Sequence, residues 1–132
     1  MSELQFNLSN IAKSTVILLG LTASSFGVTF LLSPLYAAES FGLPQTKAQK
    51  QDTAFLRVLG GRNLAIGLMG LALAYQRDFK AVGSILFCLV IPGSLDSVII
   101  WRQGVRRAAW GHIFGTILFL ILGGYFTSGK GG

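Results

Sequence analysis

Four apolar stretches constrain the fold of this chain more than any other feature. They cover residues 11–32, 54–75, 81–101 and 108–126. Each is close to the ~20 residues that an α-helix needs to cross the hydrocarbon core of a bilayer. A soluble bundle of amphipathic helices would show a polar face at the helical period, and none of these stretches shows one. The sequence therefore predicts an all-α integral membrane four-helix bundle, as a single domain over residues 1–132.

Composition supports a membrane protein. Only 12% of the residues are charged, against about 25% in ordinary soluble domains. The net charge of +6 comes from basic residues scattered at the ends of the apolar stretches, so we expect contact with membrane lipid and no nucleic-acid partner. The 17 glycines favour close helix packing, which can close one bundle or join two copies, so a homo-oligomer stays open.

Polar residues inside these spans indicate a site. The second span contains Arg57, Arg62 and Asn63, the third contains Asp96 one turn after Pro92, and the fourth begins with His112. An arginine in hydrocarbon costs at least ~2.5 kcal/mol, so such residues usually face the bundle interior and find a partner there. Pro92 predicts a kink in the third span.

The polar residues are expected to meet at one membrane face. Consecutive spans alternate in direction, so the start of the second, the end of the third and the start of the fourth share a face. At 1.5 Å per residue, Asp96 and His112 lie about 7 to 9 Å inside it. The opening of the site at this face, which we call its mouth, is expected to be ringed by Tyr36, Trp101 and Trp110, with Glu39 beside them. Aromatic residues of this kind are typical of a membrane interface.

Three interpretations remain open. The first is a structural network in which Asp96 pairs with Arg62 or Arg57, with Asn63 and His112 completing the hydrogen bonds. The second is an active site with Asp96 and His112 as catalytic residues, either of which could move protons, and with these substrate-binding residues: Arg57, Arg62, Asn63, Tyr36, Trp101 and Trp110. An ion pathway ranks third, because the face near Tyr75 and Tyr125 has no comparable polar residues.

Neither a metal nor a cofactor is expected. A single histidine and one nearby carboxylate are too few for a metal site, and no nucleotide, flavin or nicotinamide fingerprint occurs. The lone cysteine, Cys88, is expected to be buried, and residues 35–53 to form the one long connection, with Asp52 or Thr53 capping the second span.

Small and hydroxyl residues predict packing. The second span carries a row of small residues at helical spacing, the seam, which predicts close packing against another helix. In the fourth span, Gly111 and Gly115 predict a packing groove. The first span carries a row of hydroxyls that favours interhelical hydrogen bonds over a pocket wall. The seam residues are Gly60, Asn63, Gly67, Gly70 and Ala74, and the hydroxyl residues are Thr22, Ser25, Thr29 and Ser33.

Several short motifs resemble a known family. RVLGGRNLAIGL, YQRD, LDSVIIWRQG and AWGHIFG resemble a group of small, mostly fungal, four-span membrane proteins catalogued as a domain of unknown function. The resemblance covers residues 16–124, and its characteristic positions here are Arg57, Gly60, Gly61, Arg62, Asn63, Gly67, Asp96, Gly104, Gly111 and His112.

The resemblance implies a role in metabolism. Members commonly occur beside natural-product biosynthetic genes, which implies tailoring of an apolar small-molecule substrate at the endoplasmic reticulum. On that basis we expect a cofactor-independent cyclase or isomerase. The alternative is a non-catalytic accessory or scaffold subunit for a biosynthetic enzyme partner, and a transporter is a distant third.

Overall fold

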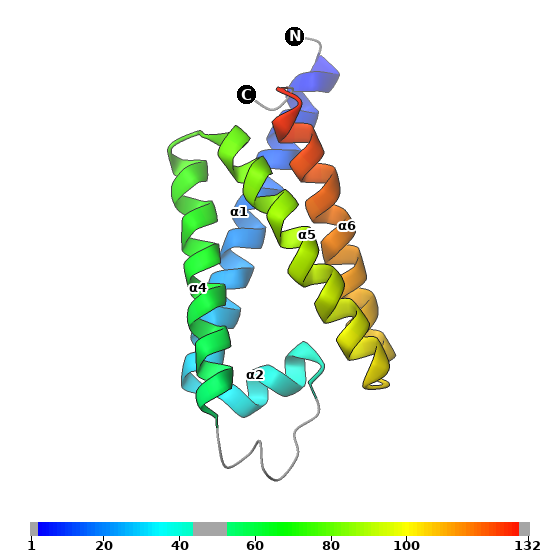
Figure 1. Cartoon of the computed structure of the whole chain (residues 1–132). Coiled ribbons are helices and arrows are strands. Elements are labelled where there is room, and N and C mark those ends of the chain that lie inside the picture. Colours follow the sequence, from blue (N-terminus) through cyan, green and yellow to red (C-terminus); the bar gives the residue numbers. More distant parts are fainter. Residues whose placement is uncertain (1–2, 44–52, 130–132) are drawn as a thin grey trace.

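The computed structural model describes residues 3–43 and 53–129, and every regular element in these ranges is a helix (Figure 1). Four of the helices are long and apolar enough to cross a membrane, which confirms the predicted all-α membrane bundle. In chain order, the elements are α1 (Glu3–Leu32), α2 (Pro34–Phe41), α4 (Ala54–Tyr75), α5 (Phe79–Arg102) and α6 (Arg106–Thr127).

The helix ends differ modestly from the predicted spans. The bounds of α4 match residues 54–75, whereas α5 and α6 begin two residues earlier and end one residue later than predicted. The largest difference is in α1, which begins at Glu3 and has 30 residues. At 1.5 Å per residue it is about 45 Å long, so about ten of its residues extend beyond a hydrocarbon core of about 30 Å.

The long helices form two antiparallel pairs. α1 packs along α4, and α5 packs along α6, whereas contacts between the pairs are few. The pairs approach each other near the two chain termini and diverge toward the opposite end, which we call the wide end (Figure 1). The end of α1, the start of α4, the end of α5 and the start of α6 lie at this wide end, as alternating spans require.

Glycines allow the close approach of α1 and α4. A Cβ atom on Gly27 of α1 would lie 2.5 Å from the backbone nitrogen of Leu64, and one on Gly60 of α4 would lie 2.7 Å from Cβ of Phe30. Gly67 is packed just as closely against α1. The predicted seam is therefore a real contact at Gly60 and Gly67, because only a hydrogen fits there.

The second pair is packed in a similar way. A Cβ atom on Gly83 of α5 would lie 3.1 Å from the carbonyl oxygen of Gly123 in α6. α5 continues as one helix through Pro92, although the proline nitrogen cannot donate a hydrogen bond to the preceding turn. Cys88 is exposed on the surface of α5, so the expectation that its thiol is buried is wrong. An apolar thiol on a spanning helix can face lipid.

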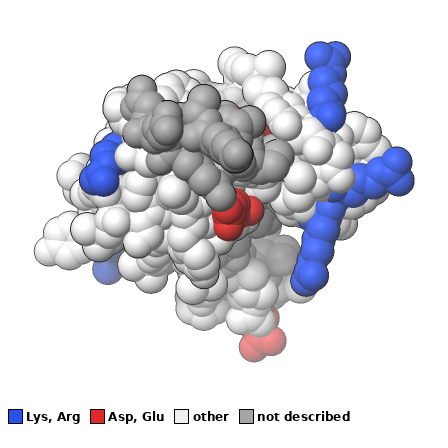
Figure 2. All heavy atoms as spheres, turned by 90° about the horizontal axis from the view of Figure 1, so that it is seen from below, with Lys and Arg blue, Asp and Glu red and all other residues white. Residues whose placement is uncertain are grey.

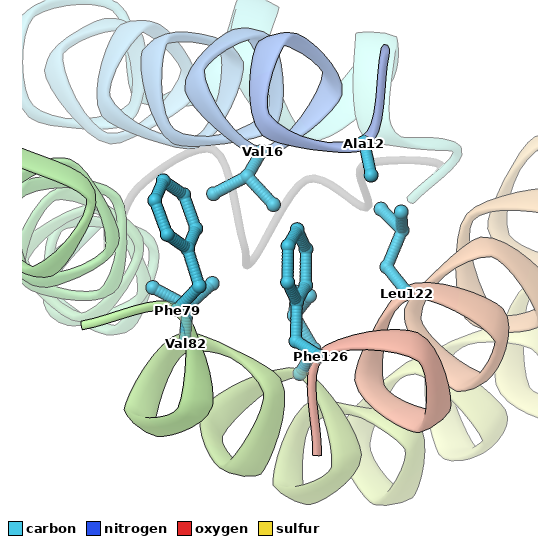
Figure 3. Close-up of a cluster of buried hydrophobic side chains, with 7 residues drawn as sticks. Ala12, Val16, Phe79, Val82, Leu122 and Phe126 are labelled. Atoms are coloured by element: carbon cyan, nitrogen blue, oxygen red, sulfur yellow. The ribbon is translucent and has the colours of Figure 1, made fainter. Parts of the chain in front are cut away.

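An apolar cluster closes the bundle near the termini (Figure 3). Its side chains come from α1, α5 and α6 and point toward one another, and the rings of Phe79 and Phe126 stack with their centroids 5.3 Å apart. Lys13 lies over the Phe79 ring at 5.0 Å. The cluster is made of Ala12, Val16, Phe79, Val82, Leu86, Leu122 and Phe126.

A short helix crosses the wide end. Pro34 ends α1 as predicted, but it also begins α2, because a proline at the first helical position needs no hydrogen-bond partner for its nitrogen. The expected connection is therefore helical as far as Phe41. Gly42 ends α2 with φ +96°, and a Cβ atom there would also lie 2.5 Å from Cβ of Ala108 in α6. Glycine is thus required for both conformation and space.

α2 joins the two helix pairs. Ala37 and Ala38 are fully buried in a cluster with Phe30 of α1 and Leu56 of α4, while Gly42 lies against α6. Thr53 precedes α4 without a side-chain capping bond. The expectation for Asp52 lies outside the described residues.

Candidate functional site

A cavity of about 280 Å³ lies between the two helix pairs, and all five helices contribute to its lining. Toward the termini it ends on Val16, Val82 and Leu86, which belong to the apolar cluster. Toward the wide end its lining includes Phe41 of α2. The cavity exists because the pairs diverge and because several of the residues that face it from α4 and α6 are glycines.

Four of the predicted site residues line this cavity together. They are Arg62 and Asn63 of α4, Asp96 of α5 and His112 of α6. Arg62 is exposed and the other three are half-buried, so the polar part of the cavity reaches the surface of the molecule. The shared location follows from the alternating helix directions used in the prediction.

His112 connects the cavity to α2. Its Nε2 lies 3.1 Å from the carbonyl oxygen of Phe41, and its ring meets the Phe41 ring edge-on with centroids 4.3 Å apart. A carbonyl oxygen can only accept a hydrogen bond, so Nε2 must carry the proton and donate it. In the neutral imidazole, Nδ1 is then the nitrogen that can accept a proton.

Asp96 lines the same cavity as His112 and Arg62 but makes no direct ion pair in the described residues. No nitrogen–oxygen ion pair within 4.0 Å occurs in residues 3–43 and 53–129. A direct ion pair of Asp96 with Arg62 or Arg57 is therefore not found there, and pairing through a bridging water stays a prediction. The Asp96 carboxylate and the Arg62 guanidinium instead line the cavity.

Arg57 has a different partner from the one predicted. Its Nη1 donates a hydrogen bond of 2.9 Å to the carbonyl oxygen of Leu31, which lies in the last turn of α1. That carbonyl is one of the four at a helix C-terminus without an intrahelical donor, and the position favours a cation. Arg57 thus fastens α4 to α1 and is not part of the cavity lining.

The predicted mouth residues lie outside the cavity lining. Tyr36, Trp101 and Trp110 are 67%, 45% and 51% exposed. The two tryptophan rings meet edge-on at 6.1 Å, and the guanidinium of Arg106 lies 5.8 Å from the Trp101 ring. Figure 2 views the wide end, with basic side chains at its periphery and acidic atoms both near its middle and at its lower edge. These aromatic residues suit a membrane interface, and their role in substrate binding stays a prediction.

Two small-residue patterns do not form the predicted contacts. Asn63 and Gly70 of the α4 seam line the cavity instead of packing on α1. Gly111 and Gly115 also line it, and a Cβ atom on either would meet nothing within 4 Å. The expected packing groove on α6 is therefore one wall of the cavity.

The hydroxyl row of α1 neither lines the cavity nor forms hydrogen bonds to another helix within the described residues. Thr22 and Thr29 donate to carbonyl oxygens one turn earlier in their own helix, at 2.8 Å each, as threonines often do within helices. No member of the row lines the cavity.

The sequence interpretation missed Phe41 and Thr116. Thr116 lines the cavity and donates to the carbonyl oxygen of His112 at 2.8 Å. It shares a helix face with His112, which is a usable sequence signal. For Phe41, the only sequence signal is the partly apolar character of residues 35–41. The sequence does not place its side chain at the cavity, because that depends on where α2 crosses the bundle.

Comparisons with known proteins complete the description of this site. No curated protein and no solved structure matches the chain. One family model matches residues 20–126, a range that contains the polar cavity residues, nearly all of α4, α5 and α6, and the last part of α1. The chain therefore belongs to the family described as "Domain of unknown function (DUF4267)".

Proposed function

We propose that this membrane protein binds an apolar small molecule in the cavity and catalyses its cofactor-independent isomerisation or cyclisation. One observation carries the proposal. Arg62, Asn63 and Asp96 line a mostly apolar cavity, and within the described ranges their side chains have no hydrogen-bonding partner. A structural network would pair these groups with one another, whereas here they face the cavity, and Arg62 is exposed where the cavity reaches the surface.

The arrangement supplies the parts of an acid–base reaction. Asp96 in its acid form would donate a proton to a carbonyl, epoxide or alkene of the substrate, while Nδ1 of His112 removes a proton from another position. The substrate gains one proton and loses one, so its composition is unchanged. The resulting imidazolium then returns a proton to the Asp96 carboxylate, which restores both groups.

The remaining lining would hold and orient the substrate. Arg62 and Asn63 can donate hydrogen bonds to an oxygen on which negative charge develops. The apolar walls would hold the body of the molecule in a reactive conformation and exclude water. We place the protein in the endoplasmic reticulum membrane, acting on a natural product, because its motifs resemble proteins encoded beside biosynthetic genes.

The test compares the metabolites of a host that carries this chain's gene together with the genes beside it and of the same host without this gene. If the protein is an isomerase or cyclase, the host without it should accumulate a compound that has the same molecular formula as the lost product. Asp96→Asn and His112→Gln should accumulate the same compound at wild-type levels of folded protein, since glutamine can still donate to Phe41. Asp78→Asn is the matched control, because asparagine also caps α5, and it should keep the product.

The alternative predicts a different outcome. A scaffold subunit would lose product only in proportion to the folded protein and the bound partner enzyme. Full product formation by folded Asp96→Asn/His112→Gln would refute the catalytic proposal.

A further inference from the structure

The polar groups of the cavity lie in the half of each helix that is nearer the wide end. On α4, Asn63 is followed by Ile66 and Gly70, seven residues or about 10 Å farther in. On α5, Asp96 lies ten residues or about 15 Å from Leu86. Thr116 is a hydroxyl residue deeper on α6, and its proton is committed to the carbonyl oxygen of His112.

The polar end offers a single strongly basic side chain. Arg62 is the one lysine or arginine in the lining identified in the described residues, and Asp96 would repel an anion whenever its carboxyl group is ionised. Sites for phosphate or carboxylate usually present several cationic donors, and Arg57 is committed to Leu31. A neutral oxygen function therefore fits this end better than an anion.

The volume limits the apolar part of the ligand. An apolar cavity of ~150 Å³ accommodates benzene, and this cavity is about 280 Å³. It therefore has room for an apolar body of about two fused rings, or a folded chain of similar size.

From these three observations we infer the substrate class. The cavity takes a neutral amphiphile with a carbonyl or hydroxyl oxygen at one end and an apolar body of about two rings. The oxygen binds at Arg62 and Asn63, and the body points toward Leu86 and the chain termini. This inference rests on the proposed function, because it takes the ligand of the cavity to be the substrate.

Three probes of one shape test the inference. 2-Acetylnaphthalene carries a neutral ketone, 2-isopropylnaphthalene is a hydrocarbon of similar shape, and 2-naphthoate carries an anion. Binding is measured with radiolabelled 2-acetylnaphthalene and the full chain in lipid nanodiscs, with empty nanodiscs subtracted. The other two probes are used as competitors at concentrations corrected for partition into lipid.

The ketone should bind about tenfold more tightly than either competitor, the discrimination expected for one hydrogen bond to a charged group. Arg62→Leu/Asn63→Leu should remove this preference and still bind the hydrocarbon. Gly70→Leu should fill the cavity and abolish binding of all three probes. Binding to the double variant also shows that it is folded, because a misfolded protein would bind none of them.

Other outcomes overturn the inference. Equal binding of ketone and hydrocarbon by the wild type would remove the oxygen-binding role, and tighter binding of 2-naphthoate would point to an anionic ligand. Binding that survives in Gly70→Leu would place the ligand elsewhere, and no binding of any probe would reject this ligand class. Probe binding is measured without turnover. If the cavity binds the ketone selectively but the Asp96 and His112 variants still form product, the proposed acid–base chemistry is refuted and the inferred ligand class is not.

Discussion

Two glycines one turn apart on α4 should respond in opposite ways to the same substitution. Gly67 lies against α1, where a Cβ atom would be 2.6 Å from the backbone nitrogen of Ser24 and 2.7 Å from the carbonyl oxygen of Gly20. Gly70 faces the cavity, and a Cβ atom there meets nothing within 4 Å. Gly67→Ala and Gly70→Ala therefore add the same methyl group to a close helix contact and to open space.

The magnitudes follow from these surroundings. Both substitutions gain up to about 1 kcal/mol, because alanine favours the helix over glycine. Gly67→Ala also places a methyl group against backbone atoms, which can yield only if α1 and α4 separate, and overpacking of this kind costs typically ~1–3 kcal/mol. We expect Gly67→Ala to be destabilised and Gly70→Ala to be stabilised slightly, with a difference between them of about 1–3 kcal/mol.

Equilibrium unfolding by sodium dodecyl sulfate in mixed micelles measures this difference, with fluorescence of the two tryptophans as the signal. The wild type and both variants are titrated under one condition, so that their free energies of unfolding can be compared directly. Equal values for the two variants, or a larger loss for Gly70→Ala, would show that the described packing of α1 on α4 is wrong.

Two further predictions concern the helix pairs and the topology. Arg57→Ala should lower the free energy of unfolding in the same titration by about 1–3 kcal/mol, because it removes a charge-assisted hydrogen bond to Leu31; an unchanged value would mean that this bond does not hold α4 to α1. In a Cys88→Ser background, cysteines placed at Asp78 and at Gln103 should react with an impermeant thiol reagent from opposite sides of sealed vesicles. Labelling of both from one side would contradict the four-span topology.

Part of the candidate site follows directly from the helix directions. Four spans that alternate in direction must bring the start of the second, the end of the third and the start of the fourth to one face. Arg62, Asp96 and His112 occupy those places, and they do line one cavity. Their shared depth was predictable because the rise of an α-helix is fixed at 1.5 Å per residue.

The pairing of those residues was not predictable in the same way. Arg57 and Arg62 have similar positions in the sequence pattern, yet one donates to Leu31 and the other lines the cavity. Five residues along a helix amount to a rotation of about 140°, since 3.6 residues make one turn. Which rotation faces a neighbouring helix depends on how the helices are packed, and that is a property of the whole bundle.

By itself, the sequence determined the membrane bundle. Apolar stretches of about 20 residues must form helices in a bilayer, because only a helix satisfies its own backbone hydrogen bonds in hydrocarbon. Tertiary structure alone decided that the helices diverge as two pairs and that α2 crosses the wide end to meet His112. Small residues such as Gly27 and Gly111 look alike in the sequence, but Gly27 lies against α4 and Gly111 lines the cavity. Close packing of two helices requires small residues on matching faces of both, and that match exists only when the helices are placed together.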